Sequence, residues 1–371
     1  MKKFIIPLIL ILCLSFTLTG YSADLFGTYD QRIKLTIDHS KIDSDLTWFP
    51  VTLFMTSTQM EEVFAEFDDD ADFDRCAITT SDESTQIYGD CELFDDSESL
   101  GIYHVAKTAI ITDADADGYL YYYYDKDAAH NTTYISKSGG TAAANVWDYT
   151  CVHLMNNLTD STSNNHTLTA YGAPSVVDTA GGKAYDLDGS TQYFSMADSN
   201  DWDFGTGDLT FEAFIDIDVI QNMEMLGFRY TSTNYAPLFR VEDSTGYRIL
   251  NYMHNSGTIQ LGDTVIDTGL TYMVVTRLNN EWMVYLDGVE DDAAWATPGS
   301  LNIVATTADI GRYSGDSFYI DGKYIQLRIS SVNRNAAWIK ATYNSFRDTL
   351  LTYGSEEVPA ADNAIFFGMA F

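Results

Sequence analysis

The second half of the sequence is a succession of short alternating apolar runs, each ended by a tight-turn dipeptide. In the first run, Leu209, Phe211, Ala213 and Ile215 alternate with small or acidic residues. Residues 271–292, 308–318 and 319–330 repeat this pattern and end at Asn-Asn, Asp-Gly or Ser-Gly. Period-2 alternation ended by such dipeptides is typical of antiparallel hairpins. Several hairpins at short spacing predict an all-β sandwich or barrel, not a helical or βαβ domain.

The order of these motifs resembles the LamG-type, concanavalin A-like jelly roll. The carrying segments are FGTGDLTFEAF (204–214), EWMVYLDG (281–288), ADIGR (308–312) and YIDGKYIQLRI (319–329). The close AAWIKATYNSFRDTLLTYGSEE (336–357) also resembles the end of that family, with a short helix expected before a last strand. The resemblance implies a jelly roll that binds a ligand and does not catalyse a reaction.

The first half of the chain predicts a second β-sandwich. Ile33, Leu35 and Ile37 alternate in residues 29–42, and residues 119–135 are dense in tyrosine, which suits sheet formation. YDQRIKLTI, YYYYDKDAAHNTTYI and residues 145–167 resemble an uncharacterised β-sandwich domain of secreted and phage or virion proteins. That domain commonly precedes a LamG-type domain and has no assigned activity, so the resemblance implies architecture alone.

These patterns divide the chain into five parts. Residues 1–23 predict a secretory signal peptide, because Lys2 and Lys3 precede an apolar run and small residues follow it; a retained membrane anchor is the alternative. We expect a first β-sandwich at 24–138, a Gly- and Ala-rich linker at 139–144 and the jelly roll at 145–358. The apolar tail 359–371 could add a strand to a sheet edge, here or in a partner, or be disordered.

The formal charge of −34 limits the partners that the chain can bind. Such a chain repels nucleic-acid phosphates and anionic lipids, so neither is an expected partner. The acidity could keep the protein soluble, or part of it could gather into cation sites, because hard cations prefer carboxylate and carbonyl oxygens. No segment after the N-terminal run has transmembrane length.

Two acidic loops are candidates for calcium. DADADG places Asp113, Asp115 and Asp117 before a glycine, as the first half of an EF-hand loop does. Position twelve is Tyr124 instead of a glutamate, so an EF-hand is rejected and a looser cation loop or a solvated turn remains.

The second loop is implied by the resemblance. TDSTSNNHT matches the LamG-type loop that often holds calcium, which implies Asp160, Asn164 and Asn165 as ligands. The acidic pair that the family carries on a later strand is replaced here by Ile325 and Gln326, and this replacement removes an expected ligand.

The cysteines predict at most one disulfide. Cys76 and Cys91 flank a polar segment that is typical of a hairpin loop. A disulfide closing this loop of about 15 residues would contribute roughly 3 kcal/mol in an oxidising compartment. Cys151 lies in an apolar run and is expected to be a buried thiol, and no cysteine spacing indicates zinc.

Glycan binding would require aromatic platforms beside polar groups. Six residues are candidates, although each aromatic side chain is more often part of a core: Tyr193, Trp202, Tyr230, Tyr235, Tyr247 and Tyr252.

Catalysis is not expected. Glucanases that share this jelly roll carry an E-x-D-x-x-E strand, whereas Glu212, Asp216 and Asp218 have a different spacing and lack the closing glutamate. Retaining hydrolysis needs two carboxyl groups about 5–5.5 Å apart, and no segment supplies the family's pair.

We therefore expect a secreted, non-catalytic protein of two β-sandwiches that recognises a glycan or glycoprotein, with calcium as the one candidate cofactor. The alternative is a structural component of a virion or cell-surface assembly, in which the tail docks to a neighbour. A degenerate glycoside hydrolase is the least favoured interpretation.

Overall fold

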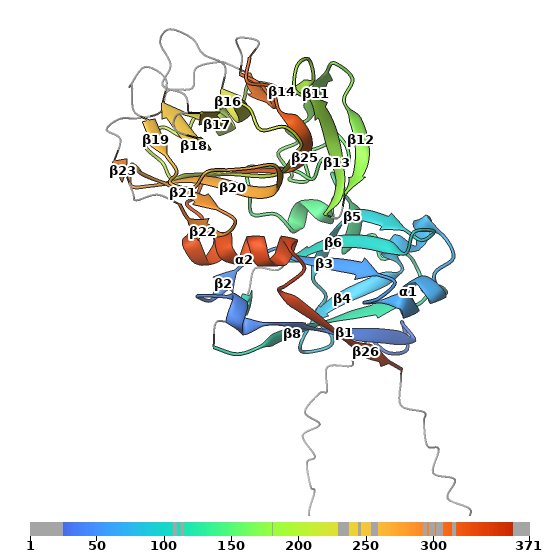
Figure 1. Ribbon diagram of the computed structural model, residues 1–371. Coiled ribbons are helices and arrows are strands. Elements are labelled where there is room, and N and C mark those ends of the chain that lie inside the picture. The colour runs from blue at the N-terminus through green and yellow to red at the C-terminus, as the bar shows by residue number, and fades with distance from the viewer. Residues whose placement is uncertain are drawn as a thin grey trace, which may run out of the picture.

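The computed structural model describes residues 25–106, 110–112, 115–179, 181–228, 237–243, 246–253, 259–291, 295–296, 301, 307–313 and 317–358. They form two stacked β-sandwiches with a helix between them (Figure 1). We call residues 25–137 together with the last strand the N-lobe, and residues 151–330 the C-lobe. The predicted all-β class with two antiparallel sandwiches is confirmed.

The N-lobe is built from two four-stranded sheets that face one another. The first has the order β26-β1-β8-β4 and the second the order β3-β6-β5-β9, while β2 pairs with β7. The strands are β1 (Gln31–Ile37), β2 (Leu46–Thr47), β3 (Val51–Thr56), β4 (Cys76–Thr80), β5 (Tyr88–Asp95), β6 (Leu100–Ala106), β7 (Ile110–Thr112), β8 (Gly118–Tyr124), β9 (Ile135–Lys137) and β26 (Leu351–Glu357). The short helices are η1 (His39–Lys41), α1 (Glu61–Glu66) and η2 (Asp70–Asp74).

Alternation along β1 determines which face of the N-lobe sheet is apolar. Ile33, Leu35 and Ile37 are fully buried in the core between the sheets, as the sequence predicts. On β8, Tyr122 and Tyr124 join the same core, whereas Tyr121 lies on the opposite face. Successive side chains of a strand point to opposite faces, so one tyrosine-rich strand serves two environments.

The C-lobe is a larger antiparallel sandwich. One sheet has the order β12-β13-β25-β15-β20-β21-β22, with β10 added at β25 and β23 at β21; the other has the order β11-β14-β24-β16-β17-β18-β19. The first sheet contains β10 (Cys151–His153), β12 (Ser175–Thr179), β13 (Gly182–Asp188), β15 (Leu209–Ile217), β20 (Gly269–Leu278), β21 (Glu281–Leu286), β22 (Val289–Glu290), β23 (Trp295–Ala296) and β25 (Asp321–Ser330). The second contains β11 (Leu168–Tyr171), β14 (Tyr193–Met196), β16 (Met223–Phe228), β17 (Pro237–Asp243), β18 (Tyr247–Met253), β19 (Ile259–Leu261) and β24 (Ala308–Ile310). Leu209, Phe211, Ala213 and Ile215 point into the core between the sheets, as expected.

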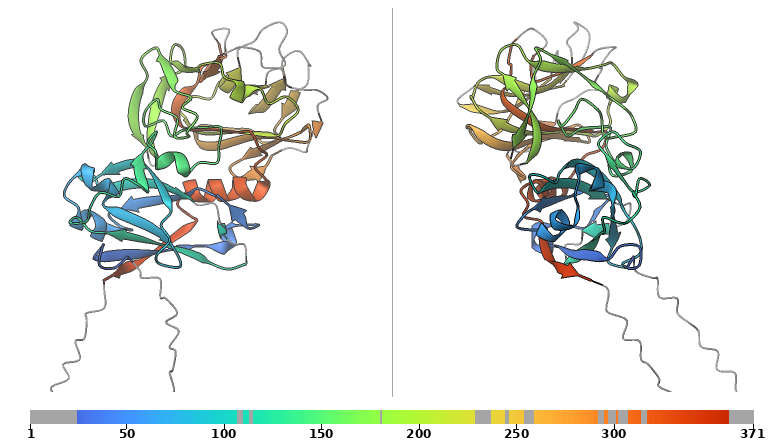
Figure 2. Two further views of the ribbon diagram at one scale, coloured as in Figure 1. Left: turned by 180° about the vertical axis from the view of Figure 1, so that it is seen from behind. Right: turned by 90° about the vertical axis from the view of Figure 1, so that its right-hand side faces the viewer.

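The predicted helix near the C-terminus is α2 (Ala336–Phe346), and it lies between the two lobes (Figures 1 and 2). Asn335 caps it, because its side chain accepts a hydrogen bond from the Trp338 N–H at 2.9 Å. Trp338 packs into the N-lobe core, whereas Phe346 stacks on Phe214 of the C-lobe at 3.9 Å between ring centroids. Both faces of α2 are therefore buried, and the helix joins the lobes.

The last strand corrects the predicted domain boundaries. β26 pairs antiparallel with β1, with Arg32 opposite Glu357 and Ile37 opposite Leu351. The C-terminal end of the predicted 145–358 jelly roll thus completes the N-lobe, because β1 would otherwise leave an unpaired edge.

The predicted linker at 139–144 is also not an extended connection. Ala142 and Ala143 are buried, and the turn η3 (Ala143–Asn145) leads directly into Val146 and Trp147 of the N-lobe core.

The predicted disulfide is not formed in the structure. Cys76 and Cys91 are both buried free thiols, and burial raises the pKa of Cys76 to about 12. They lie on β4 and β5, which belong to different sheets instead of forming one hairpin. The Cys76 thiol donates to the Phe73 carbonyl at 3.4 Å, so both side chains pack as small core groups.

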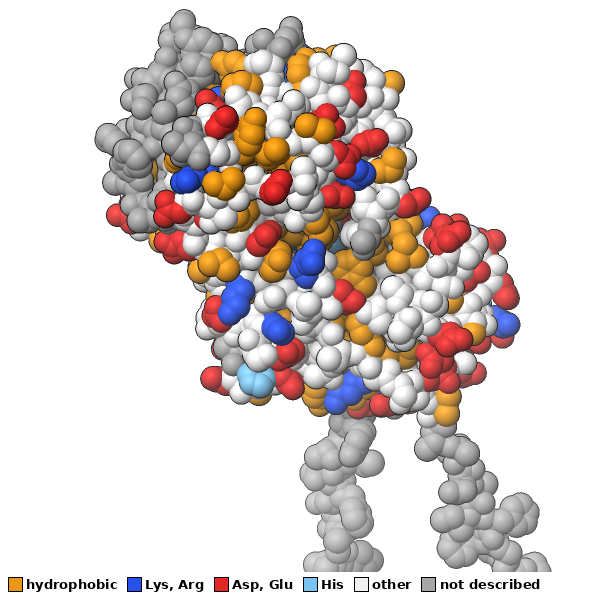
Figure 3. All heavy atoms as spheres, in the orientation of Figure 1, with side chains coloured by type: hydrophobic (Ala, Val, Ile, Leu, Met, Phe, Trp, Pro, Cys, Tyr) orange, Lys and Arg blue, Asp and Glu red, His pale blue; other side chains and the backbone are white. Residues whose placement is uncertain are grey.

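Acidic side chains predominate over basic ones on the face shown in Figure 3. Within the part of the chain that the structure describes, there is no helix with the length and apolar character needed to cross a membrane. The predicted signal peptide and the tail 359–371 lie outside the described residues.

Candidate functional site

A polar pocket opens at the end of the C-lobe that meets the N-lobe. Its volume is about 320 Å³. The lining carries hydroxyl, amide and carboxylate groups and comes from four separate segments of the chain: Asp148, Tyr149, Thr150, Asn164, Asp201, Ser330, Ser331 and Val332.

The first wall of the pocket is held by β10. The Thr150 N–H donates to the Ile329 carbonyl at 2.8 Å, and Cys151 lies opposite Ile329 in the pairing of β10 with β25. The end of β25 and the start of β10 therefore lie side by side, which brings Ser330 next to Thr150 at the pocket.

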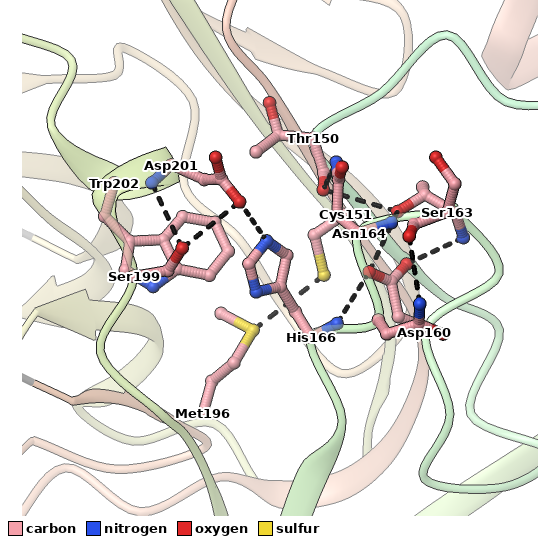
Figure 4. Close-up of polar contacts among 12 residues, drawn as sticks. Thr150, Cys151, Asp160, Ser163, Asn164, His166, Met196, Ser199, Asp201 and Trp202 are labelled. Atoms are coloured by element: carbon pink, nitrogen blue, oxygen red, sulfur yellow. Dashed lines mark hydrogen bonds and ion pairs between the residues drawn. The ribbon is translucent and has the colours of Figure 1, made fainter.

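Asp160 organises the loop that forms the second wall (Figure 4). Its buried carboxylate accepts hydrogen bonds from the N–H groups of Val152 and Thr162, both at 2.9 Å, and of His166 at 3.0 Å. It also accepts from the Thr162 hydroxyl at 2.9 Å. A short polar side chain that satisfies several backbone donors fixes the path of a loop.

The loop places Asn164 at the pocket and Asn165 outside it. The Asn164 amide donates to the Thr150 carbonyl at 2.8 Å, which ties the second wall to the first. Asn165 is an exposed turn residue in the left-handed region and donates to the Ser163 carbonyl. Asp160 and Asn164 thus belong to the same loop, but the carboxylate oxygens of Asp160 already accept hydrogen bonds from Val152, Thr162 and His166, so their role as calcium ligands stays a prediction.

The third wall is Asp201, which lies beside an imidazole. His166 Nε2 is 2.8 Å from a carboxylate oxygen of Asp201, and the His166 ring lies 4.4 Å from the Trp202 ring centroid. The Ser199 hydroxyl accepts from the Asp201 N–H and donates to its side chain, both at 3.1 Å (Figure 4). These contacts fix Asp201 at the pocket rim.

Trp202 is not a surface platform. It is fully buried in the C-lobe core, and its indole N–H donates to the Ala197 carbonyl at 3.1 Å. The prediction that Trp202 binds a ligand directly is therefore wrong, since its ring is enclosed between His166 and Phe228.

The other predicted platforms do not line this pocket. Tyr193 stacks in parallel on Tyr171, with 4.5 Å between centroids, on the outer face of the β11–β14 sheet. Tyr247 is partly buried against the core. Tyr252 lies on β18, and its side chain is not described, while Tyr230 and Tyr235 lie outside the described residues.

The DADADG segment lies in the N-lobe, away from the pocket. Asp113 falls outside the described residues, and Asp115 is exposed. An Asp117 oxygen accepts from the His39 N–H at 3.0 Å and lies 2.6 Å from His39 Nδ1, and these bonds hold the pKa of Asp117 below its usual range. Asp38 completes a group whose potential ligand atoms lie within 4.8 Å of one another. Sequence reasoning did not point to His39, because it lies 78 residues from Asp117.

Arg334 is the main site residue that sequence reasoning missed. Its guanidinium lies over the rings of Tyr149 at 4.5 Å and Trp338 at 4.1 Å, and it donates to the carbonyl oxygen of Asp148. A cation that lies over two rings and is also paired holds these three neighbours together. No local pattern joins residues 148 and 334, so only the fold reveals this contact.

Comparison with known proteins supports the fold of the C-lobe. Residues 188–340 match the concanavalin A-like lectin/glucanases superfamily, so this part of the chain is a lectin-like jelly roll. The match does not reach the first half of the chain, and the family predicted for that half stays a prediction. No curated protein matches the chain.

Similar solved structures include domain 4 of AbnA, an extracellular arabinanase from Geobacillus stearothermophilus, in complex with arabinotriose. It is 18% identical with a TM-score of 0.44, and the match covers 52% of this chain and 96% of that one. The binding domain of Botulinum Neurotoxin DC in complex with SialylT is 10% identical with a TM-score of 0.41, covering 53% and 50%. The binding domain of Paraclostridial Mosquitocidal Protein 1 is 14% identical with a TM-score of 0.40, covering 51% and 49%. The chain thus spans about half of each toxin domain, and at these TM-scores the likenesses carry no argument about function.

Proposed function

We propose that this chain is a secreted, non-catalytic recognition protein that binds a glycan or the glycan of a glycoprotein through its C-lobe. The observation that carries the proposal is the polar pocket in a lectin-like lobe. Thr150, Ser330 and Ser331 supply hydroxyl groups, Asn164 an amide and Asp201 a carboxylate. Ligand sites fix orientation and specificity with a small number of such convergent polar groups.

The charge of the chain favours a neutral glycan. Asp148 and Asp201 line the pocket, and the whole chain carries a formal charge of −34. A sulfated or sialylated sugar would meet repulsion that a neutral sugar does not.

The surroundings of the acidic residues on β15 and directly after it support a non-catalytic role. Glu212 is buried and accepts a hydrogen bond from the Tyr272 hydroxyl at 2.6 Å. Asp218 pairs with Lys323 at 2.5 Å at the far end of the strand. These carboxylates hold the sheet together, and neither lines the pocket.

A glycan array tests the proposal, with the chain lacking residues 1–23 as the probe. We expect binding to neutral glycans that falls about tenfold or more in Asn164→Ala and in Asp201→Ala, since each removes a direct polar contact. Asn165→Ala is the matched control, because Asn165 shares the loop but does not line the pocket. An EDTA arm tests the calcium expectation on the same array.

Absence of glycan binding by the unmodified chain would refute the proposal. Concentration-dependent assembly that is abolished by deleting residues 360–371 would instead favour a structural role in a larger assembly.

A further inference from the structure

We propose that the sugar-binding site does not end at the C-lobe pocket but continues as a groove into the N-lobe, where Trp48 contacts the distal part of a neutral oligosaccharide. This inference rests on the proposed glycan-binding function and adds the length of the ligand and a role for the N-lobe.

A second pocket adjoins the first at the junction of the lobes. Its volume is about 260 Å³. Its lining comes from the N-lobe and from the two segments that connect the lobes: Asp45, Leu46, Thr47 and Trp48, and Asp148, Asn333, Arg334, Asn335 and Trp338. The two pockets share Asp148. Residues 330–332 line the first and residues 333–335 line the second, so one stretch of chain runs along both.

Trp48 is the N-lobe's main contribution to this groove. Its backbone has a φ of +53°, in the left-handed region where bulky residues are genuine outliers. Such a conformation persists only where the surroundings impose it. Here the indole N–H donates to the Val146 carbonyl at 3.1 Å, and the ring is only partly buried. The strained backbone thus holds an aromatic ring at the groove in a fixed position.

Asn333 offers the groove an unused donor. Its amide nitrogen is buried and has no hydrogen-bond partner among the residues that the structure describes. Buried polar groups are nearly always paired, so a ligand oxygen would complete this site. Asn335, by contrast, uses its side-chain oxygen to cap α2.

The walls of the groove are fixed relative to one another. Arg334 lies over the rings of Tyr149 and Trp338 and donates to the carbonyl of Asp148, which lies where the two pockets meet. Trp338 also donates to the Tyr149 hydroxyl at 3.0 Å. These contacts join the start of α2 to the segment before β10, so the groove is formed before a ligand arrives.

The charge of the lining selects the class of sugar. Three carboxylates face one guanidinium across the two pockets: Asp45, Asp148, Asp201 and Arg334. The guanidinium is already paired with Asp148. A neutral oligosaccharide therefore fits better than a sulfated or sialylated one.

The test compares short and long sugars on the full chain without residues 1–23. Isothermal titration is run with neutral cello-, xylo-, manno- and arabino-oligosaccharides of about two and about six sugars. We expect Trp48→Ala and, separately, Asn333→Ala to weaken binding of the longer sugar about tenfold, the loss expected for removing one good contact at a site. Binding of the disaccharide, which fits the first pocket, should change less than about twofold.

Tyr171→Ala is the matched control, because Tyr171 is a 43% exposed aromatic residue on another face. Circular dichroism checks that each variant folds. If Trp48→Ala does not fold, Asn333→Ala alone carries the test.

The outcomes separate this inference from the proposed function. If Trp48→Ala and Asn333→Ala both bind the longer sugar as tightly as the wild type, the groove is refuted and the C-lobe pocket remains the site. Equal losses for the short and long sugars also overturn it, because the effect then lies in the first pocket. Tighter binding of a sulfated hexasaccharide refutes the charge argument. If the wild type binds no sugar, the proposed function and the groove fall together.

Discussion

Replacement of Asp160 by alanine tests whether this carboxylate holds the pocket loop together. The substitution removes the acceptor for the N–H groups of Val152, Thr162 and His166 and for the Thr162 hydroxyl. A buried donor left without a partner costs about 1–3 kcal/mol. Three N–H groups therefore predict a loss of about 3–6 kcal/mol in the free energy of unfolding, allowing for some rescue by water. For a lobe of this size, Tm falls about 2–4 °C for each kcal/mol, so a drop of about 6 °C or more is expected.

Differential scanning calorimetry measures this change, with Ser163→Ala as the control in the same loop because its side chain is exposed. Asp160→Asn should lie between the wild type and Asp160→Ala, since one oxygen of its side chain keeps two of the bonds. A loss below about 1 kcal/mol in Asp160→Ala would refute the reasoning. A calcium-specific rise in Tm that Asp160→Asn abolishes, and that magnesium does not reproduce, would show that the carboxylate is instead a metal ligand.

Burial raises the pKa of the Glu224 carboxyl group to about 8, although the Arg240 guanidinium lies 2.8 Å away. In the unfolded chain the same carboxyl group has a pKa of about 4. The folded state therefore holds a proton that the unfolded state has lost, and the stability of the protein should decline as the pH rises between these two values. From pH 5 to 8, the Tm of Glu224→Gln should decline less steeply than the Tm of the wild type. Parallel Tm curves for the two proteins would contradict this prediction. Deleting residues 349–371 removes β26 from its pairing with β1 and should lower the Tm measured by calorimetry by several degrees. Deleting residues 359–371 leaves β26 intact and should not lower the Tm. Equal effects of the two deletions would show that the pairing contributes little to stability. Cys76 and Cys91 are buried free thiols, so a thiol reagent should not modify them in the native chain but should modify both after unfolding without reductant. Mass spectrometry counts the modified thiols. If both cysteines stay unmodified after unfolding, they form a disulfide.

The parts of the fold that follow from local pattern were predictable from the sequence. Ile33, Leu35 and Ile37 alternate over a stretch that can only bury one face as a strand, and the structure buries that face. Ala336 to Phe346 form the expected helix. Each of these features depends on neighbours a few residues away.

The parts that depend on distant partners were not predictable. Nothing local to Leu351 shows that it pairs with Ile37, more than 300 residues earlier in the chain. Trp202 and Tyr193 are both aromatic residues near turns, yet one is core and the other stacks outside, because different strands lie opposite them. The groove is a stronger case, since Trp48 and Asn333 are brought together across 285 residues of sequence by the packing of α2.

The pairing of β26 with β1 has a consequence for the order in which the protein is made. The N-lobe sheet contains both the first and the last described strand of the chain. During synthesis β1 emerges early, but its partner β26 leaves the ribosome only after the whole C-lobe has been added. Until then β1, paired on one side with β8, leaves its other edge with a row of open N–H and C=O groups, which other chains can capture. We therefore expect the lobe at the start of the chain to be completed last, and the yield of native protein to depend on factors that shield this strand while translation continues.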